Sequence, residues 1–309
     1  MSGSSRLRRA TDRIREVVRP PPVNPASVDL VLAELLRAAD VASLKDPVAY
    51  VEVLRGCFEP LRFTVKEIGD SRAAGSPGGG VAGDVLFRTL LNHLGSGVFP
   101  TPAETAVRVA CVADELLADR EPFDRPDWAG DVGLHALAAS SFGRKGRMLA
   151  AAARIMRTTQ AIELGTGYGM ASVFLSSALG PDNGVVTVEI SWPQVDVARR
   201  VLAEAGCDNV QLIAGAASGT VEEVKAVVSQ ADLMFHDAEH SAAAYVDDFA
   251  AFEPVLAPGA LVIYDDIAWS NPRTPSSDLP YEGWLKVASH ARVRRAVELD
   301  GEFGMLLLS

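Results

Sequence analysis

A chain of 309 residues, 48% of them hydrophobic, can bury a large core, so we expect one large domain preceded by a smaller one. The net charge of −11 argues against nucleic acid as the main partner and favours a small molecule or a peptide. No apolar run reaches the roughly 18 residues that span a bilayer, and the three cysteines show neither metal-binding spacing nor a disulfide framework, which together indicate a cytoplasmic protein with reduced thiols.

The chain before residue 140 predicts a basic arm followed by helices. Residues 1–25 carry repeated arginines and three consecutive prolines, a composition typical of a flexible arm. The segment 71–80 is rich in glycine and serine and predicts a surface loop or a lid hinge. Within 26–139 the apolar spacing predicts a helical domain without a catalytic cluster, its helices lying near 28–36, 48–58, 81–94, 102–117 and, running past its end, 131–156.

A glycine-rich turn follows the first predicted strand. Residues 160–164 read as a buried parallel strand, Gly165, Gly167 and Gly169 permit a tight turn, and a helix is expected from about residue 171. A dinucleotide fingerprint requires Gly-x-Gly-x-x-Gly, but Met170 occupies its third glycine position. Glu163 would repel a pyrophosphate but can pair with an ammonium group. The turn therefore favours a cationic, phosphate-free cofactor, and a nicotinamide oxidoreductase is the poorer alternative.

The remainder of the chain alternates strands with helices. Such alternation predicts an α/β fold with a parallel, doubly wound sheet, and the turn at Asp300-Gly301 predicts a closing hairpin whose last strand is antiparallel to its neighbour. The predicted strands after the turn are 185–190, 210–214, 233–236, 260–264, 293–299 and 303–308.

The run from Glu163 to Gly169 resembles the first motif of class I S-adenosylmethionine (SAM) dependent methyltransferases, and the resemblance extends over 140–309. It implies a Rossmann-like fold with a mostly parallel seven-stranded sheet and SAM as the cofactor. It also implies that the helical segment 26–139 is a lid over the acceptor pocket or an oligomerisation domain, for example of a homodimer. The cofactor-binding residues expected from this motif are Glu163, Gly165, Thr166, Gly167 and Gly169.

Two further positions are expected to contact the cofactor. Glu189 closes the second strand about 20 residues after the turn, where a carboxylate can accept hydrogen bonds from both ribose hydroxyls. Ala216 stands where many members of the family have an acidic residue that meets the adenine amino group. We therefore expect that contact to come from backbone groups near Ala216 or from Ser218.

Acidic residues gather after the two strands 233–236 and 260–264. Carboxyl ends of parallel strands meet at one edge of a sheet, so Asp237, Asp265 and Asp266 can converge. Adjacent carboxylates are unfavourable unless a cation neutralises them or some are protonated. A divalent ion with oxygen ligands, Mg2+ above all, suits this set. The alternative is that these aspartates only cap helices.

These acidic runs resemble those of the metal-dependent O-methyltransferases of the catechol and caffeoyl-coenzyme A type and their bacterial natural-product relatives. The resemblance implies that Asp237, Asp265 and Asp266 hold a divalent ion that binds two adjacent acceptor hydroxyls, with Asp237 also beside the cofactor. His240 takes the place of a lysine in many members and is expected to act as the general base. His236 is expected to be structural.

The sequence thus predicts a metal-assisted O-methyltransferase for a catechol-like or vicinal-diol small molecule. Trp269, Tyr281 and Trp284 can line an aromatic acceptor pocket or simply pack in the core. Two alternatives stay open. One is a metal-independent methyltransferase for a carboxylate or a peptide, and the other is a SAM-binding regulatory protein without turnover.

Overall fold

The computed structural model describes residues 44–58, 61–68, 81–97, 101–119, 121, 132–139, 141–269 and 278–309. The predictions for the basic arm, the helix near 28–36 and the glycine-rich segment 71–80 lie outside this part of the chain. Within it, no helix combines the length and the apolar character needed to cross a membrane. The three cysteines form no disulfide, and Cys57 and Cys207 are buried.

An eight-stranded sheet in the order β1-β7-β8-β6-β5-β2-β3-β4 organises the fold. Strands β2 to β6 pair in parallel, and β8 runs antiparallel to both β6 and β7. This arrangement confirms the α/β Rossmann-like fold and its closing hairpin. The strands are β1 (Val65–Glu67), β2 (Gln160–Leu164), β3 (Gly184–Glu189), β4 (Val210–Ala214), β5 (Ala231–His236), β6 (Leu256–Tyr264), β7 (Val293–Leu299) and β8 (Phe303–Leu308).

Strand β1 is the difference from the expected seven-stranded sheet. It pairs antiparallel with β7 and lies in a segment that we expected to be entirely helical. Three residues are too few to show the alternation by which a strand is recognised in a sequence. Its position is fixed by contacts with the distant hairpin, where Lys66 bonds to Glu298 at 2.9 Å.

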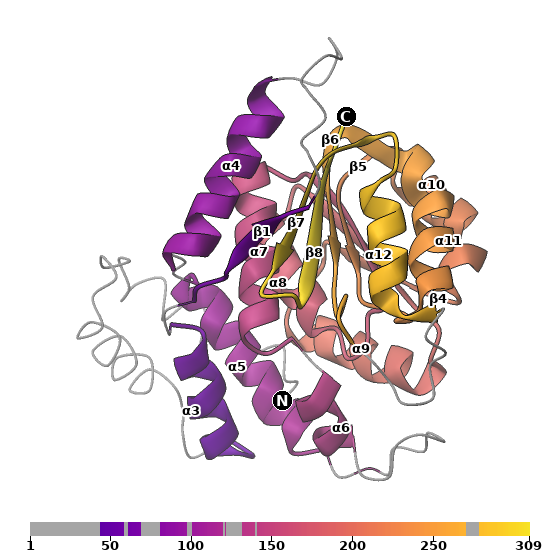
Figure 1. Ribbon diagram of the computed structural model, residues 1–309. Coiled ribbons are helices and arrows are strands. Elements are labelled where there is room, and N and C mark those ends of the chain that lie inside the picture. The colour runs from indigo at the N-terminus through magenta and orange to yellow at the C-terminus, as the bar shows by residue number, and fades with distance from the viewer. Residues whose placement is uncertain are drawn as a thin grey trace.

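Helices cover both faces of the sheet (Figure 1). The expected helix 131–156 is divided into α6 and α7, because residues 141–143 are not helical, and Gly143 is the N-cap of α7. A helix that the sequence did not predict, α12, precedes the hairpin. The helices are α3 (Pro47–Gly56), α4 (Val81–Ser96), α5 (Ala103–Leu117), α6 (Val132–Ala139), α7 (Arg144–Met156), α8 (Met170–Leu179), α9 (Trp192–Glu204), α10 (Val221–Val227), α11 (Ala242–Phe252) and α12 (Pro280–Ala288), with short 3-10 turns η2 (Ala217–Gly219) and η3 (Glu253–Val255).

The core divides according to the alternation of side chains along the strands. Ile162 and Leu164 face a layer formed by α10, α11 and α12, whereas Ala161 faces α4, α7 and α8. A third cluster joins α3, α5 and α6 to α8 and α9. The described N-terminal elements are therefore packed onto the sheet and its helices, and the carboxyl ends of the parallel strands lead into a common cavity.

Candidate functional site

A cavity of about 1350 Å³ lies where β2, β3, β5 and β6 end. The loops that follow these strands line it, as expected for ligand sites in open α/β sheets. The start of α7 and His135 of α6 also contribute to its wall, so elements from before the glycine turn complete it. This volume suits a ligand the size of a nucleoside derivative together with a small second molecule.

The glycine turn forms one side of the cavity. Gly165, Gly167 and Gly169 all adopt positive φ, of 93°, 53° and 86°. A Cβ at Gly165 would lie 2.1 Å from the backbone oxygen of Asp237, so the turn and the end of β5 touch through backbone alone. Only glycine permits both the left-handed backbone and this close approach. The turn is thus shaped to bring main-chain atoms to a ligand.

Glu189 connects this turn to the end of β3. Its carboxylate accepts hydrogen bonds from the N–H groups of Gly167 at 2.8 Å and Ser191 at 2.7 Å, and it lines the cavity. These bonds fix its orientation while a carboxylate retains further lone pairs. Thr166 is buried with its hydroxyl 2.6 Å from that of Thr187, and Ala216 lines the cavity.

Glu163 does not reach the cavity, which corrects its expected role as a direct partner of the cofactor. Its side chain is fully buried and accepts hydrogen bonds from Ser172 of α8 and, at 2.5 Å, from Thr187 of β3. Burial raises the pKa of Glu163 to about 7, against the opposing effect of these hydrogen bonds. Glu163 therefore joins α8 to β3 beneath the turn.

Lys145 lies between the carboxylates where a metal ion was expected. Its Nζ is 2.7 Å from Oδ2 of Asp237 and 2.5 Å from Oδ2 of Asp265. The Lys145 side chain is only 18% exposed. Burial lowers the pKa of Lys145, but the two carboxylates raise it by more, and the net pKa is raised. The cation that these acids require is thus a protonated lysine.

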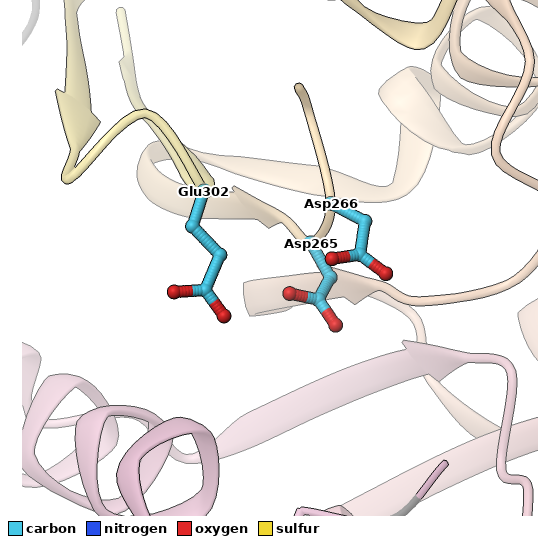
Figure 2. Close-up of side chains that lie close together, drawn as sticks. All are labelled: Asp265, Asp266 and Glu302. Carbon is cyan, nitrogen blue, oxygen red and sulfur yellow. The ribbon is translucent and has the colours of Figure 1, made fainter. Parts of the chain in front are cut away.

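Asp237, Asp265 and Asp266 converge on one cavity, as expected from the strand ends. Among the described residues, the acids whose oxygens lie within 4.8 Å of one another are Asp265, Asp266 and Glu302. Figure 2 shows Glu302, from the β7–β8 turn, beside the two aspartates that follow β6. Glu302 accepts a hydrogen bond from Arg144 at 2.7 Å. Asp237 lies beside Asp265, whose charge raises the pKa of Asp237, and the two carboxylates share Lys145.

Burial and neighbouring charge raise the pKa values of two of these acids. Burial, with the nearby charge of Asp265, raises the pKa of Asp237 well above its ordinary value despite Lys145. The same two causes raise the pKa of Asp266 to about 6. Asp266 also adopts a left-handed backbone, with φ 52°, that few residues other than glycine, asparagine and aspartate tolerate.

His240 lies at the centre of the acidic wall. Its Nε2 is 3.6 Å from Asp266 and 3.8 Å from Asp237, and its Nδ1 is 3.4 Å from the hydroxyl of Tyr245. Burial lowers the pKa of His240 to about 4, so the imidazole is neutral at physiological pH. A neutral imidazole beside two carboxylates can accept a proton from a bound hydroxyl.

The three aromatic candidates have different surroundings. Trp269 lines the cavity and its ring lies 5.8 Å from that of His240. Trp284 is fully buried in the core, where its Nε1 donates to Glu298 at 3.3 Å, and Tyr281 donates to the same carboxylate at 2.8 Å. Of the three, only Trp269 is therefore placed for an acceptor, and for the other two the structure favours packing, the alternative that the sequence left open.

The neighbouring residues of the acidic loops behave as structural groups. His236 is buried, bonds to Asp248 at 2.9 Å and stacks on Tyr264, which confirms its structural role. Ser241 provides the N-cap of α11 by accepting a hydrogen bond from the N–H of residue 244. Asp265 and Asp266 do not cap a helix, because no helix begins within 265–269.

Lys145, Arg144 and Glu302 belong to the site but were not predicted from the sequence. Two adjacent basic residues open α7, where positive charge opposes the helix dipole and is ordinarily unfavourable. That unfavourable placement was the only indication in the sequence, and it is explained by the carboxylates that the two residues contact in space. The buried pair of His135 and Tyr168, bonded at 2.7 Å in the cavity wall, had no such indication.

Part of the chain is similar to a known protein family. Residues 162–267 match a methyltransferase domain family. No match is found among curated proteins. Structural relatives include an O-methyltransferase from Bacillus cereus in complex with S-adenosylhomocysteine (SAH), 21% identical, covering 56% of this chain and 84% of that chain with a TM-score of 0.48.

Two further relatives are similarly distant. An O-methyltransferase from Streptomyces achromogenes involved in tomaymycin synthesis, in complex with SAM, is 23% identical and covers 55% of this chain and 82% of that chain with a TM-score of 0.46. A SAH-bound methyltransferase from Podospora anserina is 16% identical and covers 69% of this chain and 98% of that chain, also with a TM-score of 0.46. These values are too low to transfer a substrate or a mechanism.

Proposed function

We propose, from the premise that residues 162–267 form a methyltransferase domain, that this protein transfers a methyl group from SAM to a hydroxyl oxygen of a small molecule. The observation that supports this function most directly is one cavity with two unlike walls. The glycine turn and Glu189 form one wall, and His240 with the acidic loops forms the other. One wall suits a nucleoside and the other suits an acceptor that must lose a proton.

The residues of the first wall fit SAM. Gly165 and Gly167 line the cavity with their backbone, and Glu189 is already held in place for ribose hydroxyls. Ala216 leaves space and backbone groups near an adenine ring. When bound there, SAM supplies an electrophilic methyl group on a sulfonium sulfur, and SAH is released after transfer.

His240 is the base in this proposal. The acceptor hydroxyl gives its proton to the neutral imidazole as its oxygen forms the new bond to the methyl carbon, while the electrons of the broken carbon–sulfur bond remain on sulfur. Asp266 and Asp237 lie near Nε2 of His240 and favour the imidazolium that results. Trp269 beside His240 covers the site from one side.

The residues present do not fit the divalent ion at Asp237, Asp265 and Asp266. Lys145 already lies within hydrogen-bond distance of Asp237 and Asp265, and Arg144 bonds to Glu302 of the neighbouring acidic group. A divalent ion in contact with these oxygens would lie against a buried ammonium group, which is electrostatically unfavourable. We therefore route no step of the reaction through a metal ion.

Two measurements test this function. The first is calorimetric titration with SAH, and the second is transfer of a labelled methyl group from SAM to a panel of phenols, catechols and carboxylates. Wild-type protein should bind SAH and label a hydroxyl compound. His240→Ala should lower turnover by about 10²- to 10⁴-fold, the usual contribution of a general base, with SAH affinity changed little. Exposed His290→Ala is the control.

Three results would redirect the proposal. Absence of SAH binding would remove the cofactor site altogether. Tight SAH binding without labelling of any compound would favour the regulatory alternative, and labelling confined to carboxylates would favour the carboxylate alternative.

A further inference from the structure

Lys145 is a partly buried cation of the cavity that has no role in the proton transfer to His240. Its ammonium contacts one carboxylate from each of two adjacent loops, Asp237 after β5 and Asp265 after β6. It also lines the cavity. An ammonium group has three N–H donors, and the two carboxylates use two of them. The third is available to an oxygen atom in the cavity.

The fold holds this ammonium in place from several directions. Lys145 is the second residue of α7, a helix packed against α4 and α8. Arg144, the residue before it, forms ion pairs with Asp300 and Glu302 of the β7–β8 turn. The first turn of α7 is thereby attached to the hairpin as well as to both acidic loops. The position of the Lys145 ammonium is therefore fixed by the packing of α7 and by the ion pairs at its first turn.

Asp265 adds a second indication that this place receives a ligand. Its side chain is 2% exposed, Oδ2 accepts from Lys145, and Oδ1 is buried without a hydrogen-bond partner among the described residues. A buried carboxylate oxygen without a hydrogen-bond partner lowers the stability of the fold unless a ligand supplies a donor. Asp265 also lines the cavity, next to the free donor of Lys145. Donor and acceptor together match a hydroxyl group.

We propose that Lys145 takes the place of a divalent ion in this site and, with Asp265, binds the acceptor hydroxyl, so that methyl transfer needs no metal. This inference rests on the proposed function. Lys145 donates a hydrogen bond to the acceptor oxygen and keeps its own protons throughout, while the single hydroxyl hydrogen, bonded to Asp265 on binding, turns to His240 and passes to it in the reaction. Its fixed positive charge stabilises the negative charge that develops on that oxygen.

Metal binding tests the inference without any acceptor. Mn2+ is titrated into protein saturated with SAH and is followed by calorimetry and by the electron paramagnetic resonance signal of free Mn2+. Wild type should show no saturable binding at the acidic loops. Lys145→Met removes the charge but keeps most of the length of the side chain, and it should bind Mn2+ at least tenfold more tightly than wild type.

Control variants locate the effect. Lys225→Met, at an exposed lysine of α10 paired with Glu222, should behave as wild type. Adding Asp265→Asn to Lys145→Met should abolish the gained Mn2+ site. If Lys145→Met fails to fold, Lys145→Met with Asp237→Asn removes one uncompensated acid and takes its place in the titration.

Wild-type turnover unchanged by a strong chelator, together with absent Mn2+ binding, is the expected result. Saturable Mn2+ binding by the wild type that Asp265→Asn removes would overturn the inference, whatever the folding of the lysine variants. SAH saturation is measured before every titration. Failure to bind SAH would therefore show that the proposed function is wrong. SAH binding together with a metal site in the wild type would reject only the role of Lys145.

Discussion

At the scale of single residues, burial rather than residue type decides what the acidic wall can do. Histidine in water has a pKa near 6.5, and the sequence suggested a base matched to neutral pH. In the folded protein, burial lowers the pKa of His240 to about 4. The ring is a weaker base than expected, yet it is almost wholly in the proton-accepting form at pH 7.

The pH dependence of His240 follows from the direction of this shift. The folded ring loses its proton at a lower pH than an unfolded one, so it stays neutral as pH falls from 7 to about 5 and becomes charged only near pH 4. Ring resonances of His240 in NMR titrations should move with a midpoint near 4, and His240→Gln should lack them. A midpoint near 6.5 would show that the ring is solvated and that the proposed electrostatics are wrong.

At the scale of elements, the glycine turn and the end of β5 depend on each other. Gly165 touches the backbone of Asp237, the residue whose carboxylate meets Lys145. The position of the glycine turn therefore constrains the position of the loop after β5 through backbone contact.

Gly165→Ala should disrupt both walls. The new Cβ would lie 2.1 Å from the Asp237 oxygen, so the turn or the β5 loop must move, and SAH affinity should fall by at least tenfold with a lower melting temperature. Gly180→Ala is the matched control, because φ is 78° there too but a Cβ would meet nothing within 4 Å. It should cost about 1–3 kcal/mol of backbone strain, because φ 78° with ψ 176° is essentially limited to glycine, and it should leave SAH binding intact. Equal SAH affinities in both variants, measured by calorimetry, would refute this coupling.

At the scale of the whole molecule, the segment before residue 140 is joined to the sheet. Thr64 and Asp300 exchange hydrogen bonds of 2.7 and 2.9 Å, β1 pairs with β7, and Phe87 of α4 is buried against the sheet face. The expected division into a helical domain and a methyltransferase domain stays a prediction, but these contacts favour unfolding as one unit.

Calorimetric unfolding tests this cooperativity. We expect one transition, with equal calorimetric and van't Hoff enthalpies. Phe87→Ala should lower the free energy of unfolding of that whole transition by roughly 3–5 kcal/mol, the usual cost of a large core deletion. Val85→Ala, at a position of α4 that is 55% exposed, should have little effect. Two transitions, of which Phe87→Ala shifts only one, would instead establish independent domains.

The sequence by itself determined the parallel sheet, its closing hairpin and the glycine turn. Each of these depends on residues close together in the chain, namely apolar strands between helices and glycines at alternate positions. Pattern and spacing are therefore enough to predict them. Glu189 was also found by spacing, since its distance from the turn along the chain sets its place at the end of β3.

Only the tertiary structure decided the charge balance of the site. Lys145 is separated by 92 residues from Asp237 and by 120 from Asp265, and nothing in the local sequence relates the beginning of α7 to either loop. Electrostatic compensation depends on distance in space, and folding brings a lysine to the acids for which the sequence suggested a metal ion. Strand β1 and the burial of Glu163 were decided in the same way, by contacts between segments far apart in the chain.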